Sequence, residues 1–531
     1  MTQPRFRVLV ADAISLDGLA PLRDDPRFEL VSRPGLKGDD LASAIAEADA
    51  VLVRSSTKIT RESLARADRL KAIGRAGVGV DTIDVEAATE RGIPVLTAPE
   101  GNTISAAELT MALLLALARK VPGADRSMKA GEWDKKSFTG TELCGKTLGL
   151  IGAGRIGSEV ARRARGFAMR VLVYDPFLNT ERARALDVEI ASLDEVLEKA
   201  DVISAHVPLT DGTRNLVGKA QIARMKEGVL LLNVARGGVV DEAALVEALQ
   251  SGHVAGAALD VFETEPLPAD HVFRTLPNVV LTPHLGASTS EAQHSVAIEI
   301  AGAVRAALVD GDLSRAVNAP SLGGVDVQRV RPILHLGQRI GMLGAAIAGG
   351  ALRAIEVRYA GSHPSGLRVI AAAAVAGALT HVSGGVVNVV NATRLAQSRG
   401  IRVNQMQLGA TTPYAEMVEL RVMSDAGEAR LVGAMLGEGH ERIIRVDDYS
   451  VSVTPRGALL VVHSSDVPSV MGQVSSRLAA AGHFVDEYQQ ARREGGGEVL
   501  ALVRVDPAAT EALIGDLRAI PEVKQVQQVV L

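Results

Sequence analysis

This sequence has a single cysteine, a small net charge and no long apolar runs. The single cysteine, Cys144, excludes an intramolecular disulfide and a thiolate metal cage, so we expect no metal site. Together with the missing signal-peptide pattern, this cysteine content favours a reducing, cytoplasmic location. Cys144 lies just before a predicted strand, and we expect it to be a small buried side chain.

The charge balance and the apolar runs exclude two kinds of partner. Lys and Arg number 57 against 62 Asp and Glu, and the net charge of -5 provides no overall cationic field for nucleic acid or an anionic membrane. Apolar stretches such as residues 109–118 and 369–379 are shorter than the ~20 residues that span a bilayer. We therefore expect neither nucleic-acid binding nor a membrane span.

The sequence does contain enough apolar residues for several cores. Its 531 residues are 47% apolar and 22% charged, as in folded proteins, and the length predicts three or four domains. The expected fold class is α/β. We expect two Rossmann-like doubly wound domains, followed by an α+β domain and a ferredoxin-like βαββαβ domain.

The first predicted domain is discontinuous. Short β-rich runs alternate with helical patterns over residues 1–98, with strands expected at 8–10, 51–53, 70–73 and 94–96. A helical pattern at 290–308 is expected to return to it, which gives the boundaries 1–98 plus 290–318. The helix expected over 105–119, with Ser105 to Glu108 as its capping box, is apolar on nearly every side. It must be buried, either in its own core or against another subunit or domain.

Residues 99–289 carry a stronger alternation. Six strands are predicted, at 148–151, 171–174, 202–205, 229–234, 254–259 and 279–282, as a complete doubly wound nucleotide domain requires. Residues 319–453 are richer in Ala, Gly and Val and have a helical stretch near 327–347. In residues 454–531 the predicted order is strand, helix, strand, strand, helix, strand, which is the ferredoxin-like arrangement.

A glycine-rich turn follows the first strand of the second domain. Gly152, Gly154 and Gly157 would permit a tight turn, the approach of backbone amides to a pyrophosphate, and close helix packing. Asp175 ends the next predicted strand, where a carboxylate hydrogen-bonds an adenine ribose and repels a 2′-phosphate. The turn therefore predicts NAD in preference to NADP. The competing interpretation is a surface turn with a capping aspartate.

Three polar segments lie where later strands should end, and they contain Arg236, Glu265 and His284. Ligands of open α/β sheets bind at these strand ends. An arginine, a glutamate and a histidine that converge there would supply a carboxylate anchor, an orienting acid and a general acid/base. Taken singly, each side chain could instead be a helix cap, a loop residue or a structural histidine.

At these residues the sequence resembles the D-isomer-specific 2-hydroxyacid dehydrogenase family. The resemblance covers essentially the whole chain and is carried by residues 74–81, 102–108, 148–157, 233–242 and 283–289. It implies Arg236 as substrate-carboxylate anchor, Glu265 as the acid paired with histidine, and His284 as proton acceptor. Implied cofactor contacts are Gly152, Gly154, Arg155, Ile156, Gly157, Asp175, Ala235, Asp260 and Gly286, and implied substrate contacts are Arg54, Ser55, Arg75, Gly77 and Asn102.

The resemblance implies NAD-dependent oxidation of D-3-phosphoglycerate to 3-phosphohydroxypyruvate, the first step of L-serine biosynthesis. Phosphate recognition would come from Arg54 and Arg75, while Lys135 and Lys136 could approach from a neighbouring subunit. A second hypothesis is a dehydrogenase or reductase for another 2-hydroxy acid, such as hydroxypyruvate or glyoxylate. A third is a nucleotide- and amino-acid-sensing regulator without catalysis, against which the intact Arg236, Glu265 and His284 argue.

The C-terminal half resembles the intervening domain (319–453) and the regulatory ACT domain (454–531) of long members of the family. This implies a homo-oligomer, a tetramer with a dimer as alternative, and L-serine as effector, with Asp466 at the regulatory site. Ser469 replaces a usual glycine, and Phe484 replaces a frequent asparagine, so backbone freedom and one amino-acid contact are lost. The domain could instead mainly hold the oligomer together.

Overall fold

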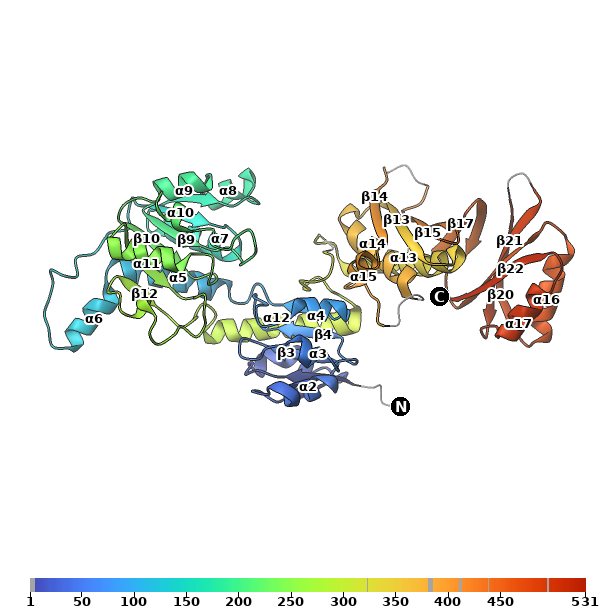
Figure 1. The fold of residues 1–531 in the computed structure, drawn as a ribbon, viewed down its shortest axis with the longest axis horizontal. Helices are drawn as coiled ribbons and strands as arrows, with labels where there is room; N and C mark the ends of the chain where they lie inside the picture. The colour runs from blue at the N-terminus through green and yellow to red at the C-terminus, as the bar shows by residue number, and fades with distance from the viewer. Residues whose placement is uncertain (1–4, 322, 381–384, 410–412, 438, 494–495) are drawn as a thin grey trace.

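A computed structural model describes residues 5–321, 323–380, 385–409, 413–437, 439–493 and 496–531. Within these residues the chain forms four sheets, one in each of four units. In Figure 1 the second unit lies at the left end, the first unit lies next to it, and the third and fourth units lie to the right. The expected α/β class, with two parallel Rossmann-like sheets and two further sheets, is confirmed.

The first unit is a parallel sheet covered on both faces. Its strand order is β2-β1-β3-β4-β5, with β1 (Phe6–Val10), β2 (Phe28–Ser32), β3 (Ala50–Val53), β4 (Ala72–Arg75) and β5 (Val95–Thr97). Its helices are α1 (Ala20–Arg23), α2 (Gly38–Ala46), α3 (Arg61–Leu64), α4 (Val85–Glu90) and the distant α12 (Ser290–Asp310), with a 3-10 turn at Asp17–Leu19. Ile300 and Val304 of α12 share one apolar core with Val8 and Leu52 of the sheet, so α12 packs back on the first unit.

The second unit is a seven-stranded parallel sheet in the order β12-β11-β10-β9-β6-β7-β8. The strands are β6 (Thr147–Ile151), β7 (Arg170–Tyr174), β8 (Glu189–Ile190), β9 (Val202–Ala205), β10 (Val229–Asn233), β11 (Val254–Leu259) and β12 (Val279–Leu281). The helices are α5 (Thr103–Ala118), α6 (Val121–Lys129), α7 (Arg155–Gly166), α8 (Thr180–Leu186), α9 (Leu193–Lys199), α10 (Lys219–Ile222) and α11 (Glu242–Ser251), with a 3-10 turn at Val272–Arg274. The strand order reverses between β6 and β9, which is where doubly wound sheets bind nucleotides.

The third and fourth units are mixed and antiparallel sheets. The third has the order β14-β13-β15-β16-β17-β18 and the fourth the order β20-β21-β19-β22. The third comprises α13 (Val327–Ala348), β13 (Leu352–Gly361), a 3-10 turn (Pro364–Gly366), α14 (Leu367–Thr380), α15 (Ala392–Ser398), β14 (Arg402–Gln407), β15 (Glu416–Ser424), β16 (Glu428–Met435), β17 (Glu441–Val446) and β18 (Tyr449–Val453). The fourth comprises β19 (Ala458–Ser465), α16 (Ser469–Ala480), β20 (Phe484–Arg492), β21 (Glu498–Asp506), α17 (Glu511–Arg518) and β22 (Val523–Val530).

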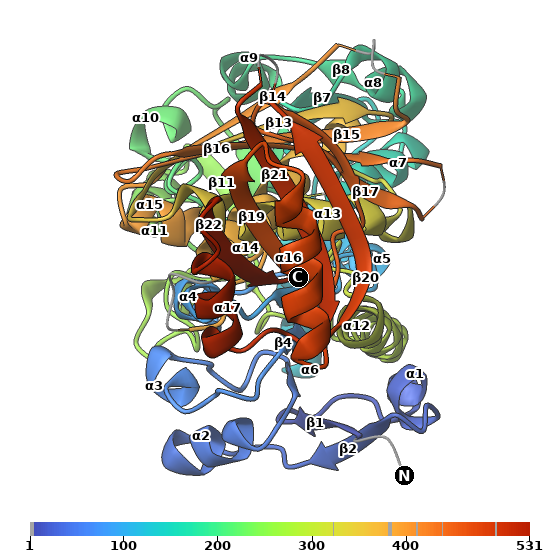
Figure 2. The ribbon, with the colours of Figure 1, turned by 90° about the vertical axis from the view of Figure 1, so that its right-hand side faces the viewer.

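The fourth sheet is apolar on both faces. Leu460 and Val462 pack beneath α16 and α17, which cover its outer face (Figure 2), whereas Leu459 and Val461 join the core of the third unit. Because successive strand residues point to opposite faces, one strand supplies both cores. The predicted βαββαβ order is observed.

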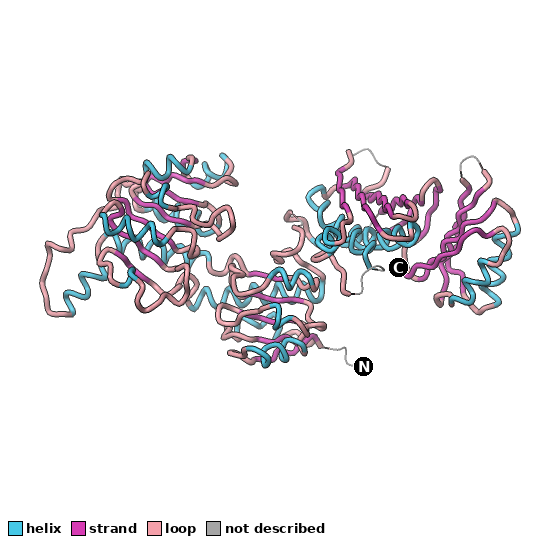
Figure 3. Tube along the Cα trace, in the orientation of Figure 1, coloured by secondary structure: helices cyan, strands magenta, loops and turns pink. Residues whose placement is uncertain are grey.

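Three local predictions were wrong. The helix α5 begins at Thr103, so Ser105 lies inside its first turn, and its Oγ bonds Thr289 Oγ1 (2.7 Å) in place of a capping box. Cys144 is exposed, because the segment between α6 and β6 runs over the surface (Figure 3). The edge strands β2 and β8 were not expected at all.

The apolar helix α5 is an internal core helix. Met111, Leu114 and Leu117 are buried with Val160 of α7 and Leu232 of β10, which favours packing within its own unit over packing on another subunit. No helix in the described ranges is both long and apolar enough to cross a membrane.

Candidate active site

The glycine turn after β6 leaves backbone room for a cofactor. Gly152 has φ +97°, and a Cβ there would lie 2.7 Å from the carbonyl oxygen of His206. A Cβ on Gly157 would lie 2.2 Å from the carbonyl oxygen of Gly152. Gly154 is the N-cap of α7, offers no capping side chain and faces open space. The amides that start α7 are thus accessible to a pyrophosphate, and the residues present fit NAD.

Asp175 directly follows β7 and holds the glycine turn. Its Oδ2 accepts a hydrogen bond from Ala153 N (2.8 Å), and its Oδ1 accepts one from Phe177 N (2.8 Å). These bonds keep the carboxylate beside the turn, where a dinucleotide would present its adenine ribose.

His284 and Glu265 form a hydrogen-bonded pair. His284 Nδ1 lies 2.8 Å from Glu265 Oε2, and Glu265 Oε1 accepts a hydrogen bond from Phe262 N (3.1 Å). Burial alone would raise the pKa of Glu265, but the hydrogen bond and charge of His284, together with Arg236, bring that pKa below its usual value. Glu265 therefore stays a carboxylate that orients the imidazole.

The backbone of His284 is held by Asp260. His284 has φ +54°, an uncommon value for a residue with a side chain. Its N–H donates to the carbonyl oxygen of Asp260 (2.9 Å), and the Asp260 carboxylate accepts from Leu285 N (2.7 Å) and Gly286 N (2.9 Å) and from Thr282 Oγ1 (2.5 Å). Burial raises the pKa of Asp260 although these donors stabilise its charge. The carboxylate fixes the turn that presents the imidazole.

Arg236 reaches from the second unit to the first. It follows β10, and its Nε lies 3.3 Å from Asp81 Oδ2 in the loop after β4. Its Nη1 donates to the carbonyl oxygen of Ala235 (2.6 Å), and Asn233 Nδ2 donates to the carbonyl oxygen of Arg236 (2.9 Å). The guanidinium is therefore oriented by partners in both units.

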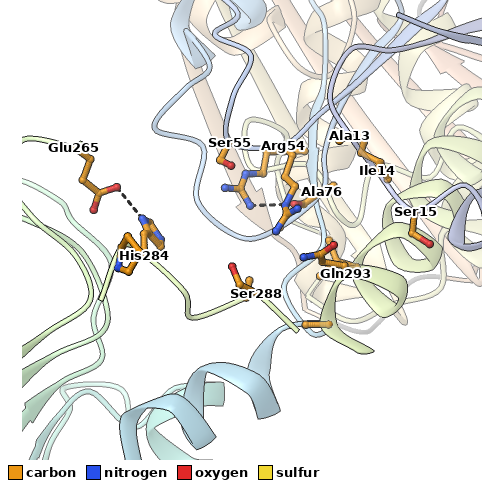
Figure 4. A pocket seen from close by; sticks show the side chains of 16 residues that line it. Ala13, Ile14, Ser15, Arg54, Ser55, Ala76, Glu265, His284, Ser288 and Gln293 are labelled. Atoms are coloured by element: carbon orange, nitrogen blue, oxygen red, sulfur yellow. Dashed lines mark hydrogen bonds and ion pairs between the residues drawn. The ribbon is translucent and has the colours of Figure 1, made fainter. Parts of the chain in front are cut away.

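A pocket of about 250 Å³ lies between the two units. Arg54 and Ser55 stand on one side of it and Glu265 and His284 on the other (Figure 4). Its lining also includes Arg75, Gly77, Ser288 and Gln293.

The buried guanidinium of Arg75 gives this pocket a positive charge. Burial, together with the positive charges of Arg236 and Arg54, lowers the pKa of Arg75 to about 10. Its buried Nε has no hydrogen-bond partner among the described residues. Arg54 and Arg75 line the pocket and Arg236 lies near Arg75, so an anion bound there would relieve the repulsion among the three guanidinium groups.

The structure does not bring every predicted residue to this pocket. Arg236 and Asn102 are not part of its lining. The buried Oδ1 of Asn102 has no partner among the described residues. Arg155 begins α7, and its Nη2 lies 3.6 Å from Glu100 Oε1, while Ile156 packs against the core beneath α7. Asp466 lies in the fourth unit, where its Oδ1 accepts a hydrogen bond from Arg492 Nε (3.0 Å).

Sequence reasoning missed two carboxylates at this site. Asp81 stands at the end of the 74–81 motif, so its place in that motif was a usable signal. Asp12 comes just after β1, as Asp175 comes just after β7, so its position at a strand end also pointed to the site. Within the described residues no group of three His, Cys, Asp or Glu side chains is arranged to hold a metal ion.

Comparisons with known proteins agree with this geometry. Residues 111–286 match the model of the D-isomer specific 2-hydroxyacid dehydrogenase NAD binding domain, and residues 329–447 match that of the D-3-phosphoglycerate dehydrogenase intervening domain. The D-3-phosphoglycerate dehydrogenase of Methanocaldococcus jannaschii is 40% identical over 522 residues, and that of Bacillus subtilis is 38% identical over 523. Each alignment covers 98% of this chain and 99% of the relative.

A solved structure also resembles the chain. The NAD-dependent formate dehydrogenase of Staphylococcus aureus in complex with NAD is 32% identical, with a TM-score of 0.52, and the match covers 58% of this chain and 96% of that one.

The parallel sheet of the second unit carries an oriented imidazole toward the arginines of the first unit. This arrangement defines an NAD-dependent oxidoreductase of the D-2-hydroxyacid dehydrogenase class. The predictions of an enzyme and of NAD as its cofactor are confirmed. Because the similarity extends over nearly its whole length, the chain belongs to the D-3-phosphoglycerate dehydrogenase family.

Proposed function

We propose that this chain oxidises D-3-phosphoglycerate to 3-phosphohydroxypyruvate with NAD, the step that opens L-serine biosynthesis. The observation that carries the proposal is that Arg54 and Arg75 line the pocket that contains His284, and that Arg236 lies close enough for its charge to act on Arg75. A substrate with a carboxylate at one end and a phosphate at the other needs cations at both ends. Arg236 would hold the carboxylate, and Arg54 and Arg75 would hold the phosphate.

In this mechanism His284 is the general base. Its Nδ1 is engaged by Glu265, so Nε2 is the nitrogen left to take the hydroxyl proton as C2 is oxidised. The Glu265 carboxylate stabilises the imidazolium that results. Arg236 keeps the carboxylate of the substrate in register with the imidazole. When bound, NAD supplies the hydride acceptor.

We propose that the cofactor is held by the residues named from the sequence. Gly152, Gly154, Arg155, Ile156 and Gly157 would cradle the pyrophosphate at the start of α7, and Asp175 would accept hydrogen bonds from the ribose. Ala235, Asp260 and Gly286 lie on the turns that carry Arg236 and His284 and would contact the nicotinamide end.

One assay tests the proposal against its alternatives. The purified chain is supplied with NAD and a panel of 2-hydroxy acids, and NADH absorbance is followed. Selective turnover of 3-phosphoglycerate supports the proposal, and preference for an unphosphorylated acid replaces it with another dehydrogenase. Absence of turnover on every acid would leave only a nucleotide-binding regulator.

We also propose the domain boundaries 1–98 plus 290–318, 99–289, 319–453 and 454–531, together with a cytoplasmic homotetramer. The return of α12 to the first core supports the discontinuous first domain. Met128 on α6 is 53% exposed, and Trp133 on the loop after α6 is 75% exposed. These exposed apolar side chains support a contact of α6 and this loop with another copy of the chain. Lys135 and Lys136 on that loop would then approach a neighbouring pocket.

For residues 454–531 we propose L-serine as effector, with Asp466 among its contacts. The competing role, an oligomer contact alone, draws support from Phe484, which is 75% exposed at the edge strand β20. Isothermal titration with L-serine distinguishes the two, because heat of binding at micromolar ligand requires a built site.

A further inference from the structure

Asp12 is a buried carboxylate that the mechanism does not use. It follows β1 and is 4% exposed. Its Oδ2 accepts hydrogen bonds from Arg54 N (2.5 Å) and Thr57 N (3.2 Å), and its Oδ1 accepts one from Thr57 Oγ1 (2.7 Å). All three donors belong to the loop 54–57 that follows β3, so one side chain ties down both ends of the loop that carries Arg54 and Ser55.

The surroundings of Asp12 place it behind the substrate pocket. Ala13, Ile14 and Ser15, which follow it directly, line the same pocket as Arg54 (Figure 4). Burial and the charges of Arg236 and Arg54 lower the pKa of Arg75, whereas the charges of Asp81 and Asp12 raise it, so the Asp12 carboxylate is near the cationic cluster. Both carboxylate oxygens of Asp12 accept hydrogen bonds from the loop 54–57. Asp12 therefore acts on the pocket by holding this loop in position.

We propose that Asp12 is a positioning residue that sets the preference for phosphorylated over unphosphorylated hydroxy and oxo acids by holding the loop 54–57. The proposal rests on the proposed function, in which that loop binds the phosphate. Asp260 does the equivalent task in the second unit, where a buried carboxylate holds the turn that presents His284.

Two substitutions at Asp12 separate position from charge. In Asp12→Asn the amide oxygen can accept from Arg54 N and Thr57 N, and the amide N–H can donate to Thr57 Oγ1, whose hydroxyl also reaches the carbonyl oxygen of Ala11 (3.1 Å). This variant keeps the loop bonds and loses the charge. Asp12→Ala removes the acceptors and leaves the buried loop amides unpaired.

Asp49 provides a matched control. It is also 4% exposed and accepts hydrogen bonds from Arg7 N (2.8 Å) and Arg69 Nη2 (2.9 Å), but it precedes β3 and therefore lies at the opposite edge of the same sheet. Asp49→Ala should cost the unit comparable thermal stability without touching the pocket.

The experiment compares kcat/KM for reduction of 3-phosphohydroxypyruvate and of hydroxypyruvate by NADH, with the full chain. In Asp12→Ala the ratio of the two values should fall roughly tenfold or more, mainly through KM of the phosphorylated acid. In Asp12→Asn and in Asp49→Ala the ratio should stay within about threefold of wild type.

Each outcome decides between the two ideas. A wild-type chain with no preference for the phosphorylated acid overturns the proposed function and the phosphate role of the loop with it. A wild-type chain that has the preference, together with an Asp12→Ala chain that keeps it, overturns the role of Asp12 alone. An equal fall in Asp49→Ala would also overturn that role, because general destabilisation would then explain the loss.

Discussion

Gly79→Ala adds one methyl group beside the arginine that joins the two units of the active site. A Cβ at this position would lie 2.0 Å from Arg236 Nη2 and 2.6 Å from Asp81 Oδ2. Gly79 has no positive φ, so alanine can adopt its backbone conformation without strain. The atoms that must move are the ends of two side chains, so we expect the backbone fold to stay unchanged.

The size of the effect follows from this geometry. Ordinary van der Waals contact begins at 3.4 Å, so the guanidinium has to retreat by at least 1.4 Å. Because a misplacement of about 1 Å at a reacting centre can cost ~10²-fold in rate, we expect kcat/KM for the hydroxy acid to fall by roughly that factor, or about 2.7 kcal/mol. The midpoint of thermal unfolding and the affinity for NAD should change little.

The assay follows NADH absorbance at varied 3-phosphoglycerate, with thermal unfolding and NAD titration on the same samples. Gly302→Ala is the matched control, since its added Cβ meets nothing within 4 Å on α12. Wild-type kcat/KM in a folded Gly79→Ala chain would refute the reasoning, because it would mean that the position of Arg236 beside Asp81 does not matter for substrate.

Three further sets of substitutions test the general base, the glycine turn and a buried histidine. His284→Asn should lower kcat by ~10²–10⁴-fold with unchanged NAD affinity, measured by steady-state kinetics and NAD titration; near-normal turnover would contradict its role as base. Gly154→Ala should weaken NAD binding roughly tenfold, about 1.4 kcal/mol, and leave the unfolding midpoint unchanged. Gly157→Ala should lower both the NAD affinity and the unfolding midpoint, because its Cβ would lie 2.2 Å from a backbone oxygen. Equal behaviour of the two variants would count against the glycine turn as the cofactor cradle. Burial lowers the pKa of His206 from 6.5 to about 4. Between pH 6.5 and pH 4 the unfolded chain therefore binds more protons than the folded chain, so the free energy of unfolding falls as pH falls through this window. His206→Gln should abolish about 3 kcal/mol of that loss, measured by denaturant unfolding at pH 7 and pH 4, and an undiminished loss would show that other groups cause it.

Much of the fold was predictable because its signals are local. The six expected nucleotide strands and the βαββαβ order come from short runs of apolar residues set against helical periods. The edge strands β2 and β8 were missed because most of their side chains are at least partly exposed, so neither strand carries a long run of buried apolar residues. The start of α5 was misjudged because the partner of Ser105 is Thr289, 184 residues away in the sequence.

For the site, the sequence by itself determined which residue types stand at the ends of the strands. The glycine turn, Asp175 and the Glu265 and His284 segments were visible because each lies next to the strand that positions it. Only the tertiary structure decided which of these side chains meet across the two units. Arg236 reaches Asp81, and Asp12 holds a loop 42 residues further along the chain. Such pairings depend on how whole strands and units are placed beside one another, and no local pattern of residues encodes that placement.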